Sequence, residues 1–227
     1  AQGILDRKLE GLPEDGALGE RRKAGRGLTR PELAVLLAHA KIALSYDLIA
    51  SRVPDGATMR PLLASYFPPA LQQTYASDIA AHPLAREIVT TELTNRIVNM
   101  CGPDLPSRLA DDWGLDVEAV TRAMLGALDM LDAEGLFAAI GGLDTRIGGS
   151  NQLSLYAEAQ RLVRRQAATL ASLSRRLAAL DHAMPAVADV FRRLVSQSEG
   201  VLTAPRTAER DARMAKWRDR GAPVVLA

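Results

Sequence analysis

The sequence contains few of the residues that carry chemistry or covalent stability in small folds. A single cysteine, Cys101, occurs among 227 residues, so an intrachain disulfide is impossible and thiolates are too few for a structural zinc site. Cys101 ends an apolar helical pattern just before Gly102, which favours packing at a helix end over a role as a nucleophile. Aromatic residues make up 4% of the chain, and the alternating runs of Val, Ile, Thr and aromatics that mark strands are missing. These absences favour an all-α fold.

Membrane and export signals are also missing from the sequence. No apolar run approaches the roughly 20 residues needed to span a bilayer. The opening residues, AQGILDRKLEGL, lack the apolar block of a signal peptide. These two absences predict a cytoplasmic protein that does not enter a membrane, and the 48% content of hydrophobic residues predicts a globular one.

Catalytic and cofactor motifs are absent as well. The three histidines, His39, His82 and His182, form no metal-binding spacing. There is no GxSxG elbow, no GxxxxGK[ST] loop and no strand followed by GxGxxG. The glycine pairs within Gly141–Ser150 are flanked by helical patterns, so they predict a hinge or loop and not a phosphate cradle. We expect no catalytic, cofactor-binding or metal residues in this chain.

Charge is distributed unevenly. Residues 1–152 carry 15 basic and 20 acidic side chains, and residues 153–227 carry 13 and 7. Such asymmetry marks either a nucleic-acid surface or two ends that dock on different neighbours. Two basic clusters are candidates for binding a phosphate, an acidic neighbour or a nucleic acid: Arg22, Lys23, Arg26 and Arg30, and then Arg161, Arg164, Arg165, Arg175 and Arg176. The shortage of aromatic stacking groups makes nucleic acid the less favoured partner.

Residues 27–44, GLTRPELAVLLAHAKIAL, contain a helix start followed by an apolar face. Thr29 and Glu32 have the spacing of a capping box, and Pro31 suits the first turn. Leu28 and Leu33 are placed as a hydrophobic staple. Apolar residues then recur every three or four positions, so we expect one side of a helix over 30–50 to be buried: Leu33, Leu36, Leu37, Ala40, Leu44 and Leu48.

Further helical patterns cover most of the chain, so we expect a compact bundle of roughly 8 to 9 helices. Pro68 and Pro69 open a helix with Leu71, Tyr75 and Ile79 on its inner side. The helix over 84–101 ends at Gly102 and carries a polar stripe of Thr91, Asn95 and Asn99, which either faces water or bonds a neighbouring helix. The other expected helices cover 59–66, 117–131 capped by Asp116, a short one capped by Asp132, a long one from 153 to beyond 170, one opening at Pro185, and 207–220. We divide the chain into an N-terminal segment with a basic loop (1–28), a helical domain (29–200) and a charged helical segment (201–227).

Three ordered stretches carry a family resemblance. LPEDGALGERRKAGRG is followed by LTRPELAVLLAHAK and then by residues 66–102, YFPPALQQTYASDIAAHPLAREIVTTELTNRIVNMCG. Together they resemble the C-terminal region of the large bacterial NAD-specific glutamate dehydrogenases. His39, where the family often has tyrosine, and the glycine-rich 141–150 depart from the family pattern.

The resemblance implies that the chain is a fragment of a far larger enzyme. Family members oxidatively deaminate L-glutamate to 2-oxoglutarate and ammonia while reducing NAD, and their catalytic lysine, aspartate and nucleotide-binding domain lie upstream. This chain would then be a helical domain with a structural, assembly or regulatory role, inactive alone and without its own cofactor. Its expected partners are the upstream catalytic domain and further copies of the parent. The alternative is a free-standing helical module that binds an anionic partner.

Overall fold

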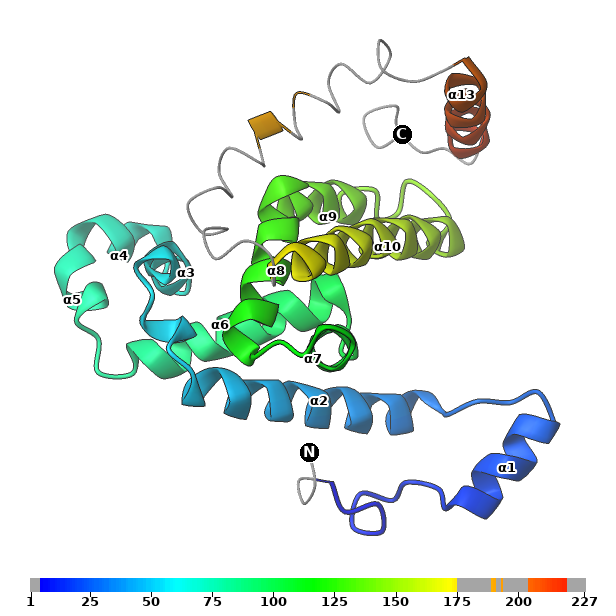
Figure 1. The fold of residues 1–227 in the computed structure, drawn as a ribbon, viewed down its shortest axis with the longest axis horizontal. Coiled ribbons are helices and arrows are strands. Elements are labelled where there is room, and N and C mark those ends of the chain that lie inside the picture. Colours follow the sequence, from blue (N-terminus) through cyan, green and yellow to red (C-terminus); the bar gives the residue numbers. More distant parts are fainter. Residues whose placement is uncertain (1–4, 175–188, 191–192, 194–203, 220–227) are drawn as a thin grey trace. The chain divides into compact units, whose positions relative to one another are not determined.

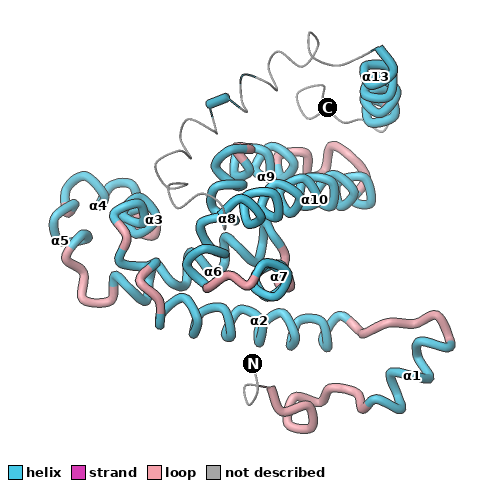
Figure 2. The backbone as a smooth tube through the Cα atoms, in the orientation of Figure 1, coloured by secondary structure: helices cyan, strands magenta, loops and turns pink. Residues whose placement is uncertain are grey.

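The computed structural model describes residues 5–174, 189–190, 193 and 204–219. These residues form helices, turns and loops, with no strand among them (Figures 1 and 2). They include eleven α-helices, eight of which have seven residues or more. The predicted all-α class is therefore confirmed. The chain divides into two compact units, Ala1–Asn99 and Met100–Ala227, which are described separately below. The predicted boundaries near residues 28 and 200 stay predictions.

Most residues of the first unit lie in helices, and these helices differ widely in length. Its elements are α1 (Asp15–Lys23), α2 (Arg30–Ala50), two 3-10 turns η1 (Val53–Asp55) and η2 (Ala57–Met59), α3 (Arg60–Ser65), α4 (Pro69–Thr74), α5 (Ala76–Ala80) and α6 (Ala85–Cys101), of which all but the last two residues belong to this unit. Helix α1 was not predicted, because its sequence DGALGERRK buries no residue and has no apolar stripe. Half of the expected basic loop is therefore helical.

Helix α2 begins as the sequence predicts. The Thr29 backbone N–H donates to Glu32 Oε2 over 2.7 Å, and the Glu32 N–H reaches Thr29 Oγ1 over 3.5 Å, which closes the capping box. Pro31 lies in the first turn, where no intrahelical bond needs its missing N–H. Two free donors of the helix end are thereby satisfied, so the start of α2 is well defined.

The segment after Pro68 differs from the single helix that was predicted. It forms two short helices, α4 and α5, separated at Tyr75, whose φ of −117° and ψ of 31° are not helical. Ile79 is buried, but Leu71 and Tyr75 are exposed. The apolar spacing matched one continuous helix, and the break at Tyr75 turns Leu71 and Ile79 onto different faces.

Arg86 ties the start of α6 to the end of α2. Its guanidinium donates to the carbonyl oxygens of Ile49 and Ser51, both over 2.6 Å, and it pairs with the Asp55 carboxylate. The carbonyls at a helix C-terminus lack intrahelical partners and carry partial negative charge, so an arginine there is stabilising. This contact was not predicted, because Arg86 and Ile49 lie far apart in sequence.

The second unit is built around a long helix. Its elements are α7 (Leu105–Trp113), α8 (Val117–Met130), α9 (Ala133–Gly141), α10 (Gly149–Ser174) and α13 (Ala204–Arg218). Helix α10 packs against α7, α8 and α9. Its buried residues Leu155, Ala159, Val163, Ala167 and Ala171 recur every four positions and form one stripe. Small residues on this stripe and on α8 allow the two backbones to approach closely.

Several predicted boundaries in the second unit are confirmed. Asp116 caps α8 by accepting from the Ala119 N–H over 2.7 Å. Helix α10 extends past Leu170, and α13 covers most of the helix expected over 207–220. Helix α7 was missed. Its signals were Pro106 in the first turn, the buried pair Leu105 and Leu109, and Gly114 as a left-handed C-cap.

Two details around α9 correct the predictions. Asp132 precedes α9 as expected, but it has a φ of 45° and its side chain makes no capping bond. The connection over 141–150 is anchored and not a free hinge, since Leu143 is buried with Ile140, Leu155 and Ala159. Gln152 also donates to the Ile140 carbonyl over 3.0 Å. The helix predicted to open at Pro185 lies almost wholly outside the described residues.

Candidate functional site

The apolar surface of α2 is the most unusual feature of the first unit. Only 11% of its most apolar 18-residue stretch is buried, namely Leu44 and Leu48. Leu33, Leu37, Ile42 and Tyr46 remain 51%, 39%, 42% and 62% exposed. The prediction of a buried face is therefore right for the C-terminal half of α2 and wrong, within this chain, for Leu33 and Leu37. These two side chains stay exposed because no described segment packs against the N-terminal half of the helix closely enough to bury them.

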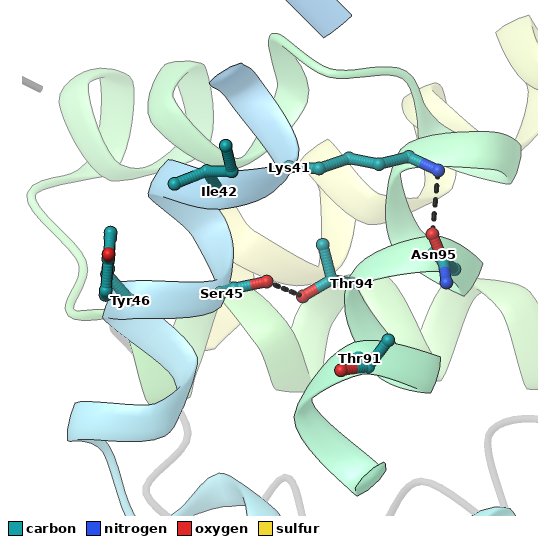
Figure 3. A pocket seen from close by; sticks show the side chains of 7 residues that line it. All are labelled: Lys41, Ile42, Ser45, Tyr46, Thr91, Thr94 and Asn95. Carbon is teal, nitrogen blue, oxygen red and sulfur yellow. Dashed lines mark hydrogen bonds between the residues drawn. The ribbon is translucent and has the colours of Figure 1, made fainter. Parts of the chain in front are cut away.

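A groove lies between α2 and α6 within this unit. It encloses about 290 Å3 and is lined by seven residues: Lys41, Ile42, Ser45, Tyr46, Thr91, Thr94 and Asn95. The Lys41 ammonium donates to Asn95 Oδ1 over 2.7 Å, and the hydroxyls of Ser45 and Thr94 lie 3.0 Å apart (Figure 3). These two bonds fix the facing sides of the helices. Figure 3 shows Lys41 and Asn95 at one end of the groove and Ile42 and Tyr46 toward the other.

The sequence left open whether the polar stripe of α6 faces water or bonds a neighbouring helix, and its residues do both. Asn95 bonds the neighbouring helix through Lys41. Thr91 and Asn99 are exposed, and Thr91 donates to the Glu87 carbonyl of its own helix over 2.9 Å. Lys41 was not predicted as a site residue, although it is the only Lys, Arg, Asp or Glu between Leu33 and Tyr46. An isolated charge in an apolar helical stretch was the signal that could have identified it.

The basic cluster before α2 is organised by an acidic residue. Arg21 donates to both carboxylate oxygens of Glu32, over 2.9 and 2.8 Å, and Lys23 pairs with Glu20. The hydrogen bond from the Thr29 N–H, followed by the Arg21 guanidinium, holds the pKa of Glu32 below its usual range. The capping box occupies donors that an anion at this helix end would use, so the geometry lends no support to a phosphate site here.

The second basic cluster is not a continuous cationic face. Arg164 turns toward the end of α6 and donates to the Cys101 carbonyl over 2.9 Å, and it forms a two-point contact with Asp104 over 2.8 and 2.7 Å. Arg161 pairs with Glu158, whereas Arg165 is exposed. Arg175 and Arg176 lie outside the described residues. The hydrogen bonds from Arg164 outweigh the effect of burial and lower the pKa of Asp104, and the same pairing raises the pKa of Arg164.

Residues with metal-binding or nucleophilic side chains do not gather in the described part of the chain. Within it, no group of three or more His, Cys, Asp or Glu residues is placed to hold a metal ion. His39 Nε2 lies 3.1 Å from Glu10 Oε1, and His82 Nδ1 accepts from the Leu84 N–H over 3.1 Å. Cys101 is fully buried, as expected for a packed helix end, and His182 lies outside the described residues.

One helix meets the length and composition of a membrane span. Among the described residues, α2 alone is long and apolar enough to cross a bilayer, which corrects the expectation that no apolar run approaches that length. Lys41 and Asp47 fall within the stretch. A single such helix is weak support for a membrane, because core helices of other proteins have the same composition.

The fold and the groove together define an all-helical domain with an incompletely covered apolar helix and no assembled reaction centre among the described residues. The sequence model of a family described as "Glutamate dehydrogenase, C-terminal" matches residues 25–227. The chain belongs to this family. The resemblance seen in the sequence is thereby confirmed.

Three relatives named "NAD-specific glutamate dehydrogenase" support this membership. The Halomonas elongata protein is 38% identical over 165 residues, which are 73% of this chain and 10% of that protein. The Pseudomonas aeruginosa protein is 36% identical over 233 residues, covering 100% of this chain and 14% of the relative. The Mycobacterium tuberculosis protein is 34% identical over 165 residues, again 73% and 10%. The chain thus corresponds to about a seventh or less of the curated relatives it matches.

Proposed function

We propose that this chain acts as the non-catalytic C-terminal helical domain of an NAD-specific glutamate dehydrogenase. In that protein the reaction converts L-glutamate, NAD and water to 2-oxoglutarate, ammonia and NADH. The nicotinamide cofactor and the reacting groups belong to upstream parts of the polypeptide. The helical domain contributes to assembly, stability or control of the catalytic part, in the cytoplasm and in a homo-oligomer of the parent.

The exposed apolar side chains of α2 carry this proposal. Leu33 and Leu37 lie on the side of the helix that Leu44 and Leu48 bury farther along, and Ile42 and Tyr46 lie on the opposite side. Large apolar side chains exposed together on one helix mark an interaction surface. Covering such a face with another part of the same protein removes that surface from water, at roughly 25 cal/mol per Å2 of apolar area. The small share of the relatives' length that this chain represents supports a partner within the same polypeptide.

The test uses the full-length protein that carries this chain. Leu33→Asp with Leu37→Asp places two charges on the uncovered face, and we expect a lower melting temperature or loss of the assembled form. Leu9→Asp is the matched control, because Leu9 is also an exposed leucine and precedes α1. Unchanged melting and oligomer size in the double variant would contradict the proposal.

The alternative of a free-standing module that binds an anionic partner gains little support from the geometry. Arg164, Arg161 and Arg21 each pair with an acidic side chain of the same chain. Salt-dependent binding of DNA or RNA at physiological ionic strength would favour that alternative.

A further inference from the structure

The groove between α2 and α6 holds a positive charge that has no negative partner among the described residues. Lys41 is half-buried, and its ammonium group has three donors, one of which is used by Asn95. None of the seven lining residues is Asp or Glu, and Lys41 forms no ion pair with the described part of the chain. Removing an ammonium group from water is costly unless it is paired, so the groove is complementary to a carboxylate.

Asn95 adds further donors at the same end of the groove. An ammonium group only donates, so Oδ1 of Asn95 is the atom that faces Lys41. The amide nitrogen of Asn95 then points away from Lys41, as Figure 3 shows. A carboxylate placed beside this pair would accept from the lysine and from the amide together. Hydrogen bonds of this charge-assisted kind are roughly twice as strong as neutral ones.

The other end of the groove is apolar and open. Ile42 and Tyr46 line the groove and are exposed there, so another segment can cover their apolar surfaces. A volume of about 290 Å3 is at the lower limit of pockets that enclose small molecules, which span roughly 300–1,000 Å3. A shallow groove with an exposed tyrosine is typical of a surface that receives side chains of a protein segment.

A second copy of this chain is a poor occupant. In a two-fold dimer the same patch faces itself. Because the groove has a cation and no carboxylate, such pairing would place two ammonium groups in one interface without an acid. The occupant must bring its own negative charge.

We propose that this groove, defined by its seven lining residues, receives a segment of the same polypeptide from outside these 227 residues. The segment presents an Asp or Glu carboxylate to Lys41 and Asn95 and an apolar side chain to Ile42 and Tyr46. This inference rests on the proposed function and deepens it, because it names the docking surface and the chemistry of the docked segment. Most of the length of the relatives lies outside the part that this chain matches, and it supplies the candidate segments.

Carbodiimide cross-linking of the full-length protein tests the contact directly. The reagent joins a lysine amine to a carboxylate that touches it, and peptide mass spectrometry identifies both partners. We expect Lys41 to be joined to an Asp or Glu outside the 227 residues. Lys23 and Glu20, which lie 2.7 Å apart, provide an internal positive control for the chemistry.

Substitutions at Lys41 give a second, independent readout by hydrogen exchange of α2 and α6 in the full-length protein. Lys41→Glu should speed exchange about tenfold or more, since truncating one partner of a buried charge pair has effects of at least that size. Lys41→Arg keeps the charge and should exchange close to the wild-type rate. Lys8→Glu, at an exposed lysine, is the matched control.

The outcomes separate this inference from the proposed function. If Leu33→Asp with Leu37→Asp weakens assembly, but Lys41→Glu leaves the exchange of α2 and α6 unchanged and Lys41 remains unlinked, only the groove assignment is overturned. If the double variant leaves melting and assembly unchanged, the proposed function fails as well. A cross-link from Lys41 to a second copy, detected by mixing isotopically labelled and unlabelled protein, overturns the inference in favour of self-association. Protection of Lys41 from acetylation only after addition of phosphatidylglycerol vesicles overturns it in favour of a lipid surface.

Discussion

Two arginines show how single residues stabilise helix ends in this protein. Arg86 bonds the carbonyls at the end of α2, and Arg164 bonds the Cys101 carbonyl at the end of α6. Each also pairs with a nearby aspartate. The sequence predicted Arg164 as part of a basic cluster and predicted no role for Arg86. Helical spacing gives the direction of a side chain about its own axis, but not which distant carbonyl it reaches, so these roles could not be predicted.

Arg164→Met should lower the free energy of unfolding by about 1–3 kcal/mol, because it removes charge-assisted hydrogen bonds that Arg164 donates. One acceptor is the carbonyl of Cys101, a residue with no exposed surface. Urea unfolding of the purified chain, followed by circular dichroism, measures the change. Arg165→Met is the control, because Arg165 is exposed on the next position of α10. Equal midpoints for the two variants would show that the Arg164 contact contributes nothing.

At the scale of helices, strong local signals predicted the fold and weak ones failed. The starts of α2 and α8 are set by side chains that bond their own first turns, so Thr29, Glu32 and Asp116 were readable from sequence. Helices α1, α4 and α5 are short and have weak local signals, whereas α7 had readable signals in Pro106 and Gly114 that were overlooked. The family resemblance identified the family of the chain, but it gave no information on where these short helices begin and end.

The start of α2 should be sensitive to acid. The folded-state pKa of Glu32 is lowered, first by the Thr29 N–H and then by Arg21, so its stabilising effect is complete above the unfolded-state pKa of 4.5. That effect is lost as the pH falls through the lower folded-state value. Glu32→Gln keeps an acceptor for Thr29 but loses the charge that pairs with Arg21.

We therefore expect Glu32→Gln to be less stable than the wild type at pH 6.5. The difference between their free energies of unfolding should become smaller toward pH 3. Thr29→Ala, which removes the other half of the box, should cost about 0.5–2 kcal/mol at either pH. Urea midpoints at the two pH values measure both effects. Thr169→Ala is a control within a helix, where alanine is the better helix former. An equal difference between the urea midpoints of wild type and Glu32→Gln at both pH values would refute the acid sensitivity.

At the scale of the whole molecule, the groove and the uncovered face of α2 both depend on residues whose partners the sequence could not name. The prediction that Leu33 and Leu37 are buried came from their spacing, which says only that a helix has an apolar side. Whether that side is covered depends on chain outside the helix. The same limit applied to Lys41, whose contact with Asn95 joins positions 54 residues apart.

The division of labour within the parent protein gives the last prediction. Known dinucleotide sites place a pyrophosphate at a helix start behind a β-strand, and the described residues contain helices and loops but no strand. We therefore expect the purified 227-residue chain to produce no NADH from glutamate and NAD, and to show no heat of NAD binding by calorimetry. The full-length protein, assayed in the same buffer, provides the positive control. Glutamate-dependent NADH production by the chain alone would place reacting groups within these residues, and the non-catalytic role would have to be abandoned.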